Sequence, residues 1–495
     1  KVVVTSERQV SGPARFDEAL PQPPAKLGFY RDIAVLAFRT PEGERVRMRD
    51  AKPSVTLGEA RLDGAKAADG SPATSVQLGL PKPKEPVFIQ LAFAQPFTAR
   101  MLTLTPGPGM QGCGGRVEAS DDGLAFRPVE TFSVGRGNEV RTFAFKPATA
   151  RFFRVLFTSA STKTKRIAVA EVDLSAKVGV ENLAGKIFLD RGGEFRAEAA
   201  VEVDAGAVVR GDEIVNLTAA LGADARLAWA VPEGEWTILR LGYTANGRSN
   251  HPAPKEGTGL ECDKLSKEAA QAHWDGHMAK VVAELGKYAG KADAGLNNVL
   301  IDSYEVGCQN WTSGFEAEFR RRSGYDLTPF LPTLTGRVVD SPEKTERFLW
   351  DFRRVIADLF AENYAGQFAE MAHRAGLQFS VEPYGNCPSD DLPYGRFGDL
   401  PMSEFWPGND SNPGNAKLAA SVAHVYGKKF VGAESFTASP EAGKWLKDPF
   451  SLKAQGDAVY CAGVNRIIYH RYAHQPWTGP TRYPGMTMGQ WGTHF

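Results

Sequence analysis

Short apolar runs that end in acidic residues recur along the second half of the chain, and they constrain its fold more than any other feature. The first lies in residues 298–311, whose sequence is NVLIDSYEVGCQNW. Its apolar residues 299–301 are typical of a strand that is covered on both faces. Asp302 and Glu305 follow at once. Because α/β folds place their chemistry at the carboxyl ends of parallel strands, the pattern predicts a functional site at that edge.

Similar segments follow at residues 377–383, 400–405, 429–435 and 465–471. Aligned by their strand ends, the segments place these residues on one rim: Glu305, Glu382, Glu404, Glu434 and His470. A single glutamate after a strand is often only a solvated loop residue or an ion-pair partner. Four of them at one edge are harder to explain in this way, because clustered carboxylates repel one another and persist where charge is needed for chemistry or for a metal.

Helical patterns separate these strand-like segments. Apolar residues recur at helical spacing in residues 266–288, 315–323, 345–375, 416–426 and 451–462. With a further strand-like segment at residues 236–243, this gives six strands that alternate with helices, which is typical of an α/β fold. The sequence therefore predicts an incomplete (β/α)8 barrel that comprises strands 3–8, with two more strands expected before Lys1.

The first half of the chain has a different pattern. Residues 87–93, 99–104 and 151–157 alternate apolar and polar side chains and are bounded by Gly, Pro and Asp turns, which predicts an antiparallel jelly-roll sandwich. We expect four regions in the 495 residues. Residues 1–50 form a connector with a strand from a preceding part of the barrel, and residues 51–176 form the sandwich. Residues 177–235 form a β-rich linking segment, and residues 236–495 form the barrel.

The charge balance and the cysteines exclude several classes of protein. Lys and Arg together number 58, as do Asp and Glu, so no large positive field is available to bind nucleic acid or an anionic membrane. The sequence has no apolar run of about eighteen residues, and we expect no membrane span. The five cysteines are far apart with no CxxC pair, which argues against a disulfide framework or a thiolate metal site. A neutral substrate fits such a protein better.

Paired carboxylates at the ends of barrel strands are what glycoside hydrolysis requires. One carboxyl group protonates the leaving oxygen, and the other either attacks the anomeric carbon or activates water. Their separation decides the outcome, about 5 Å for retention and roughly 6.5–9.5 Å for inversion. Trp311, Trp406 and Trp477 lie close to strand ends in the sequence and either stack on sugar faces or pack in the core.

The sandwich segment resembles a discoidin-type, galactose-binding-like jelly-roll. The resemblance rests on residues 116–129, which contain the turn Ser120-Asp-Asp-Gly123, and on residues 151–157 and 169–174. Many modules of this kind bind sugars, and many are only structural spacers, so both roles stay open.

The C-terminal two-thirds of the chain resembles glycoside hydrolase family 106, the α-L-rhamnosidases. The matching motifs, in chain order, are GRSNHPAP (247–254), GTGLECDK (257–264), DSYE (302–305), VEPYG (381–385), SEFW (403–406), GAESF (432–436) and YHRYAHQPW (469–477). The resemblance implies an inverting hydrolase that uses two glutamates and a calcium ion near the sugar hydroxyls.

Carried over by motif, the resemblance implies a role for each residue. Glu305 of DSYE and Glu434 of GAES are the catalytic pair, with Glu305 as the general acid and Glu434 as the base or with these two roles exchanged, and Asp302 either tunes Glu305 or holds substrate. Glu404 and Glu382 are left as ligands for a hard cation, which suits Ca²⁺ better than Zn²⁺. The residues implied in contacts with the sugar, besides the three tryptophans, are Arg248, Asn250, His251, Tyr384, His470 and His474.

Two classes of function follow. The first is an enzyme that removes terminal α-L-rhamnose from a plant glycoside or polysaccharide. The second is a carbohydrate-binding protein in which the sandwich binds sugar and the barrel is a scaffold. The carboxylates at both Glu305 and Glu434 favour the enzyme, and a retaining glycosidase of other specificity differs only in geometry. We expect residues 1–495 to be an internal piece of a longer protein, without its signal peptide, and we expect the full-length protein to be periplasmic or secreted.

Overall fold

A computed structural model describes the chain except for residues 83–86, 111, 136–139, 190–202, 252, 292–294, 386–388, 408–412, 444–445 and 471–495. The chain forms two compact units. The first unit comprises Lys1–Gly247 with Gln309–Arg353, and the second comprises Arg248–Cys308 with Arg354–Phe495. Each unit therefore combines segments that are far apart in the sequence.

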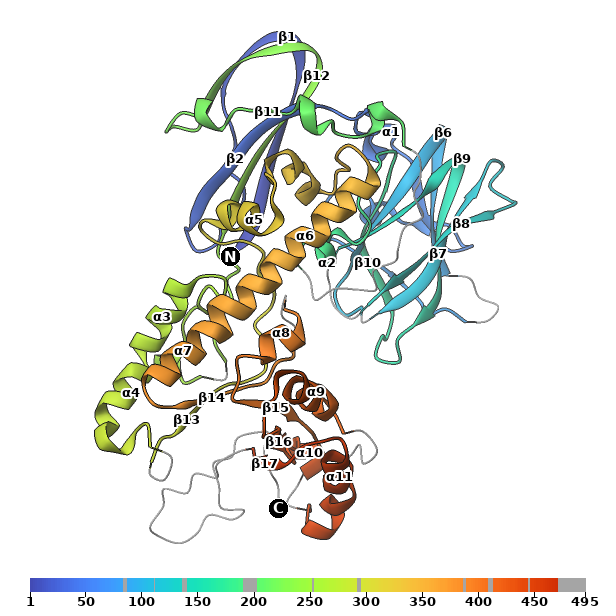
Figure 1. The fold of residues 1–495 in the computed structure, drawn as a ribbon. Helices are drawn as coiled ribbons and strands as arrows, with labels where there is room; N and C mark the ends of the chain where they lie inside the picture. Colours follow the sequence, from blue (N-terminus) through green and yellow to red (C-terminus); the bar gives the residue numbers. More distant parts are fainter. Residues whose placement is uncertain are drawn as a thin grey trace. The chain divides into compact units, whose positions relative to one another are not determined.

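A four-stranded antiparallel sheet lies in the first unit (Figure 1). Its order is β1 (Val2–Ala19), β12 (Arg226–Thr244), β2 (Tyr30–Arg39) and β11 (Val215–Asn216). Strand β1 pairs with β12 from Val2 opposite Thr244 to Ala19 opposite Arg226. The predictions that residues 236–243 form a barrel strand and that the chain begins with a strand of the barrel are therefore wrong. An apolar run predicts a covered strand, but it does not reveal a partner more than two hundred residues away.

The antiparallel strands predicted within residues 51–176 are confirmed, and they form one eight-stranded sheet. Its strands are β3 (Ser54–Leu57), β4 (Leu62–Asp63), β5 (Val76–Leu78), β6 (Val87–Pro106), β7 (Cys113–Ser120), β8 (Arg127–Val134), β9 (Arg141–Ala160) and β10 (Ile167–Ser175). The order β4-β3-β6-β9-β7-β8 is antiparallel throughout, and β10 pairs with β5 and β6. The two long strands, β6 and β9, shift register together, and Phe93, Phe97 and Phe153 pack in the core there.

The first unit also contains short helices and turns, some of which pack together through aromatic side chains. They are α1 (Met48–Ala51), α2 (Leu183–Lys186), α5 (Phe315–Ser323) and the first part of α6 (Pro342–Phe360), with 3-10 turns η1 (Glu42–Glu44), η2 (Ala65–Ala67), η3 (Ala205–Ala207), η4 (Gly211–Glu213), η5 (Thr218–Ala220) and η8 (Thr328–Thr335). Helix α5 ends where predicted, at Gly324, which adopts a left-handed conformation with φ of 81°. Phe319 and Phe348 pack with ring centroids 5.7 Å apart.

The second unit is built on a parallel sheet of five strands in chain order (Figure 1). The strands are β13 (Asn298–Ile301), β14 (Gln378–Val381), β15 (Leu400–Glu404), β16 (Gly432–Ser435) and β17 (Arg466–Tyr469). They lie within the five strand-like segments predicted from residue 298 onward. A parallel sheet whose neighbours follow one another in the chain has the topology of half a barrel. Within the described residues the sheet has five strands rather than the predicted six.

Helices cross over between these strands, as parallel connections require. They are α3 (Lys267–Gly276), α4 (Met278–Leu285), α7 (Gln367–Arg374), α8 (Asp391–Gly395), α9 (Ala416–Tyr426), α10 (Pro440–Gly443) and α11 (Pro449–Cys461), with 3-10 turns η6 (Lys255–Gly257) and η7 (Gly286–Tyr288). Helix α7 packs on β14 and α9 packs on β15. The helix predicted at residues 266–288 is interrupted at His277, where α3 ends and α4 begins.

The helix predicted at residues 345–375 contains a π-helical turn. Helix α6 is followed by η9 (Ala361–Gly366), which is a π-helix, and then by α7. The apolar stripe of the sequence runs at spacings of three and four except for one gap of five, from Leu359 to Tyr364, and the π-helical turn lies at this gap. Gly376, with φ of 73°, follows the helix, whose end agrees with the predicted range of residues 345–375. Of the helices that the structure describes, none is long and apolar enough to cross a membrane.

Candidate active site

The five parallel strands bring the predicted acidic residues to one edge of the sheet. Asp302 follows β13, Glu382 follows β14, and His470 follows β17. Glu404 is the last residue of β15 and is paired in register with Glu434 of β16. Since parallel strands end at the same edge, side chains from five different segments gather there. The structure places Glu382, Glu404, Glu434 and His470 at the strand ends where the sequence alignment put them, and adds Asp302 in place of Glu305, which lies further along the loop.

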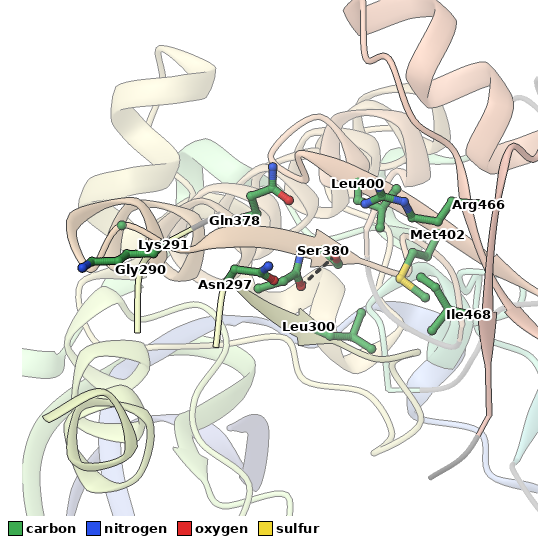
Figure 2. Close-up of a pocket in the computed structure, with 12 residues that line it drawn as sticks. Gly290, Lys291, Asn297, Leu300, Gln378, Ser380, Leu400, Met402, Arg466 and Ile468 are labelled. Carbon is green, nitrogen blue, oxygen red and sulfur yellow. Dashed lines mark hydrogen bonds between the residues drawn. The ribbon is translucent and has the colours of Figure 1, made fainter. Parts of the chain in front are cut away.

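Alternation along the strands puts these groups on one face of the sheet. The residues two positions earlier on four of the strands, Leu300, Ser380, Met402 and Ile468, line a single cavity of about 740 Å³ beside the sheet (Figure 2). Within it, the Ser380 hydroxyl donates a hydrogen bond of 2.9 Å to Asn298 Oδ1. Because side chains two apart share a face, Asp302, Glu382, Glu404 and His470 continue this face toward the carboxyl ends of the strands.

A second cavity of about 960 Å³ contains the carboxylates themselves. Its lining includes Asp302, Glu305, Glu404, Glu434 and His470. Aromatic and basic side chains complete the wall, among them His251, His273, Trp274, His277, Tyr364, Phe368 and Trp406. A cavity of this size with convergent polar groups is the usual form of a small-ligand site.

Glu434 is the carboxyl group whose surroundings most favour proton exchange near neutral pH. Burial raises its pKa to about 7, and the nearby charges of Asp302, Glu404 and Glu305 act in the same direction. The Thr437 hydroxyl donates a hydrogen bond of 2.7 Å to Glu434 Oε1 and opposes this shift. His470 Nδ1 lies 3.6 Å from the same oxygen. Burial also raises the pKa of Glu404, to which Glu305 and Asp302 add repulsion.

Glu382 is fully buried. Burial, together with the adjacent Asp302, raises its pKa to about 11, so this carboxyl group is neutral at pH 7 in the absence of a cation. The backbone N–H of Ser303 donates a hydrogen bond of 3.0 Å to Glu382 Oε2. Glu382 Oε1 has no hydrogen-bond partner among the described residues. A buried oxygen without a partner costs free energy, which a bound cation would offset.

Three carboxylates could hold such a cation. Oxygen atoms of Asp302, Glu382 and Glu434 all lie within 4.8 Å of one another. Oxygen ligands of this kind suit a hard ion such as Ca²⁺ better than Zn²⁺. The prediction made Glu382 and Glu404 the ligands. The geometry includes Glu382 in the group of three, whereas Glu404 stands outside it and instead lies beside Glu434 on the next strand.

Glu305 lies on the loop after β13 and is exposed. The Ser303 hydroxyl donates a hydrogen bond of 2.9 Å to Glu305 Oε1. Arg248 reaches the same loop, because a Cβ atom added to Gly307 would lie 3.0 Å from Arg248 Nε. The motifs that carry Arg248 and Glu305 are therefore neighbours in space.

The other predicted sugar contacts divide into three groups. His251 and Trp406 line the cavity, and Trp406 is 37% exposed. Asn250 uses its side-chain amide within its own loop, since its Nδ2 donates to the Gly257 carbonyl at 3.0 Å and its Oδ1 accepts from the Gly259 N–H at 2.8 Å. Tyr384 is buried, and burial together with Glu382 raises its pKa.

The prediction that Trp311 stacks on a sugar is wrong. Trp311 is 1% exposed, and its ring packs 4.6 Å from that of Phe315 between centroids, in the aromatic core of the first unit. Proximity to a strand end in the sequence did not reveal this burial, because the chain passes from the second unit to the first at Gln309. His474 and Trp477 lie outside the described residues.

Two residues of the cavity, Glu261 and Lys264, received no role in the sequence analysis although both belong to the GTGLECDK motif. A charged residue in a loop is commonly solvated, and no sequence signal distinguishes it from one that is buried. Lys264 is 2% exposed.

Two known proteins, one of them with a solved structure, are similar to this chain. The solved structure of a rhamnosidase from Novosphingobium sp. PP1Y matches 100% of this chain with a TM-score of 0.82 and 29% sequence identity. A curated protein of Formosa agariphila, named "Putative beta-glucuronidase", is 48% identical over 289 residues, or 58% of this chain. The chain spans 48% of the length of the first protein and 24% of the second.

The resemblance noted in the sequence motifs is confirmed over a wider region than the C-terminal two-thirds. A family model described as alpha-L-rhamnosidase matches residues 1–495. The chain belongs to glycoside hydrolase family 106.

Proposed function

We propose that the protein is a glycoside hydrolase that removes terminal α-L-rhamnose from plant glycosides or polysaccharides. The observation that carries the proposal is the convergence of Asp302, Glu305, Glu404 and Glu434 in one cavity at the carboxyl edge of a parallel sheet. Membership of family 106 and the likeness to a solved rhamnosidase support it.

In the proposed mechanism Glu305 and Glu434 act as the catalytic pair. Glu305 protonates the glycosidic oxygen of the leaving group while Glu434 removes a proton from the attacking water, so that the C–O bond breaks as water adds to the opposite face of the anomeric carbon. The result is inversion. Thr437 orients Glu434 through its hydrogen bond, and Ser303 orients Glu305 in the same way. His470 lies beside Glu434 and lines the cavity.

We propose that Asp302 and Glu382, with an oxygen of Glu434, hold a calcium ion. The buried Oε1 of Glu382 supports this assignment, since its lack of a hydrogen-bond partner in the described structure leaves it available to a cation. A bound Ca²⁺ would supply positive charge that orients sugar hydroxyls and keeps the carboxylates ionised. Glu404 would then modulate Glu434 from the neighbouring strand rather than bind the ion.

We further propose that β13 to β17 are part of a complete (β/α)8 barrel. The parallel order of the five strands supports this, because sequential parallel strands curl into that architecture. Export to the periplasm or the medium would bring such an enzyme to its polymeric substrate.

A second specificity is suggested by the name of the Formosa agariphila relative, which refers to β-glucuronidase. A uronide differs from a rhamnoside by a carboxylate on the sugar ring. His251, His273 and His277 are basic side chains that line the cavity and could face such a group. Hydrolysis of aryl α-L-rhamnoside and aryl β-D-glucuronide by the full-length protein distinguishes the two specificities directly.

The test of the proposal compares Glu305→Gln and Glu434→Gln with a matched control. Each change removes a carboxylate without changing side-chain volume, so each should abolish release of p-nitrophenol from the α-L-rhamnoside in the full-length protein while the circular dichroism spectrum stays unchanged. Glu284→Gln, on the outer helix α4 and outside the cavity, should retain full activity. An active Glu305→Gln/Glu434→Gln double variant would refute the catalytic assignment.

A further inference from the structure

A buried ion pair lies in the wall of the second cavity, the one that the strand-end carboxylates line. Lys264 is 2% exposed, and its ammonium group contacts the Glu261 carboxylate, whose side chain is 21% exposed. Lys264 Nζ also donates to the Cys262 carbonyl at 3.4 Å. Both members of the pair line the cavity, although neither is one of the strand-end carboxylates.

The ammonium group of Lys264 lies between two tyrosine rings. Its Nζ is 5.1 Å from the ring centroid of Tyr364 and 5.9 Å from that of Tyr304, which is within the range of cation–π attraction. Tyr364 belongs to the π-helical turn η9. The preceding residue in that turn, Asn363, donates a hydrogen bond of 2.8 Å from Nδ2 to the Leu265 carbonyl. The π-helical turn therefore holds the segment that carries Lys264.

Tyr304 anchors the loop that carries Asp302 and Glu305. It is 5% exposed, and its ring packs edge-on against Phe360 with centroids 5.1 Å apart. Its backbone N–H donates to the Tyr384 carbonyl at 3.3 Å. Its hydroxyl donates a hydrogen bond of 2.5 Å to the Gly307 carbonyl, which closes the turn from residue 304 to residue 307. The position of Glu305 therefore depends on the position of the Tyr304 ring.

A buried ion pair is weak evidence for stability, because the desolvation of two charges offsets much of their attraction. What the pair contributes is a fixed relative position of the groups that it contacts. An ammonium group that contacts one carboxylate and two ring faces fixes all three groups relative to one another, which an apolar side chain of similar length would not do. One of those rings belongs to Tyr304, which anchors the loop that carries Asp302 and Glu305.

We propose that the Glu261–Lys264 pair is a positioning element that acts through Tyr304 to hold the loop of residues 302–307 in its catalytic geometry. The proposal rests on the proposed glycosidase function. Lys264 does not touch the reacting atoms in this role. Its loss should therefore lower kcat by misplacing Glu305 and leave KM nearly unchanged.

The experiment compares Lys264→Met with Lys186→Met in the full-length enzyme. Lys186 is a matched control, since its side chain is 4% exposed, is paired with Glu346 at 2.6 Å, lies in the first unit and does not line the cavity. We expect Lys264→Met to lower kcat on the aryl α-L-rhamnoside by about 10- to 100-fold, the cost of a misplaced catalytic group. Lys186→Met should leave kcat unchanged. A raised KM with unchanged kcat in Lys264→Met would show a substrate contact instead and would overturn the proposal.

Hydrogen exchange gives a readout that does not require activity. Amides of residues 302–307 should exchange faster in Lys264→Met than in the wild type, and at the wild-type rate in Lys186→Met. Unchanged exchange in Lys264→Met would refute the positioning role even if the enzyme were active. A wild-type protein that is inactive on the rhamnoside would refute the proposed function and leave the exchange result to decide the positioning role.

A double-mutant cycle with Tyr304→Phe tests the route of the effect. Tyr304→Phe removes the hydroxyl that bonds to Gly307 and keeps the ring. If Lys264 acts through Tyr304, the two changes together should lower kcat by less than the product of their separate effects. Independent effects would contradict a shared route. Glu261→Gln, which keeps the side-chain volume, serves in place of Lys264→Met if that variant does not fold.

Discussion

Glu404 and Glu434 stand opposite each other in register on the adjacent parallel strands β15 and β16. Neighbouring strands are about 4.8 Å apart, so two carboxyl groups that would repel each other when ionised are held side by side. The charge of Glu404 is one of the causes that raise the pKa of Glu434 to about 7, after burial and Asp302. The sheet register itself therefore tunes the catalytic group.

The first prediction concerns this pair. Glu404→Gln removes a negative charge beside Glu434, so the pKa of Glu434 should fall and the base should stay ionised at lower pH. The acidic limb of the pH profile of kcat/KM, which reports the free enzyme, should move to lower pH. Glu370→Gln on helix α7, an exposed glutamate outside the cavity, should leave the limb in place. A limb that moves to higher pH in Glu404→Gln would contradict the role of Glu434 as base.

A second prediction links calcium to pH. The pKa of Glu434 is raised from 4.5 to about 7 in the fold, so the native state binds more protons than the unfolded state between these values, and stability falls as the pH rises through this window. A cation needs the ionised carboxylates and offsets their repulsion. Calcium should therefore raise the melting temperature more at pH 8 than at pH 5, as measured by differential scanning fluorimetry against a chelator.

Glu382→Gln provides the control for the calcium prediction. It keeps the side-chain volume and removes one of the three proposed ligands, so the calcium-dependent shift should shrink at both pH values. An equal shift in the wild type and in Glu382→Gln would place the calcium elsewhere.

The stereochemistry of the product is a third prediction. If water is activated by one glutamate and the leaving oxygen is protonated by the other, the first-formed rhamnose should be the β-anomer. Proton NMR during the first minutes of hydrolysis, before mutarotation, measures this. Initial release of the α-anomer would establish a covalent intermediate and a retaining mechanism.

Two tryptophans should respond differently to replacement. Trp406 lines the cavity and is partly exposed, so Trp406→Ala should raise KM for the rhamnoside by about 10-fold, the worth of one aromatic contact, with little loss of stability. Trp311 packs in the aromatic core, so Trp311→Ala should lower the free energy of unfolding by about 3–5 kcal/mol. Urea unfolding and steady-state kinetics on both variants make the comparison. A change in KM for Trp311→Ala at unchanged stability would restore it as a sugar contact.

Arg337 gives a further stability contrast, within the first unit. It is a buried cation that donates to Glu7 at 2.6 and 2.9 Å and to Glu44 at 2.7 and 2.8 Å. Arg337→Met leaves Glu44, whose side chain is 9% exposed, without its cation, and should cost about 3–5 kcal/mol in urea unfolding. Arg347→Met, which breaks an exposed pair with Glu343, should cost less than about 1 kcal/mol. Similar costs for both would argue against the burial of the Arg337 cluster.

The strands of the parallel sheet could be predicted because each combines an apolar run with a polar end, and both signals are local. The segment at residues 236–243 carries the same apolar signal, yet it pairs with β1, since the sequence around a strand does not encode the identity of a distant partner. The same limit explains Trp311. Its neighbours in the sequence belong to the site, whereas its neighbours in space are Phe315 and Phe352.

The sequence predicted which carboxylates belong to the candidate site, but it did not predict how deeply each is buried or what packs around it. Glu305, Glu404 and Glu434 were found from strand ends alone, and the structure brings them into one cavity. That Glu382 is fully buried, and that Lys264 is buried against two tyrosines, depends on packing from helices and loops elsewhere in the chain. Burial of a charged residue has no periodic signature in the sequence.

The π-helical turn η9 also sets the phase of the long helix that contains it. Each residue of an α-helix advances the side chain by about 100°. The extra residue in a π-helical turn therefore shifts the side chains after the turn by about that angle from the positions they would have in a continuous α-helix. The apolar stripe of the sequence has its gap of five at the same place, so the π-helical turn keeps Val355 and Leu359 of α6 on the same side of the helix as Phe368 and Met371 of α7. If η9 refolded as regular α-helix with the same residues, the stripe would break by about 100° and Tyr364 would turn with it, so a change that leaves every side chain of the cavity in the sequence could still disassemble its wall.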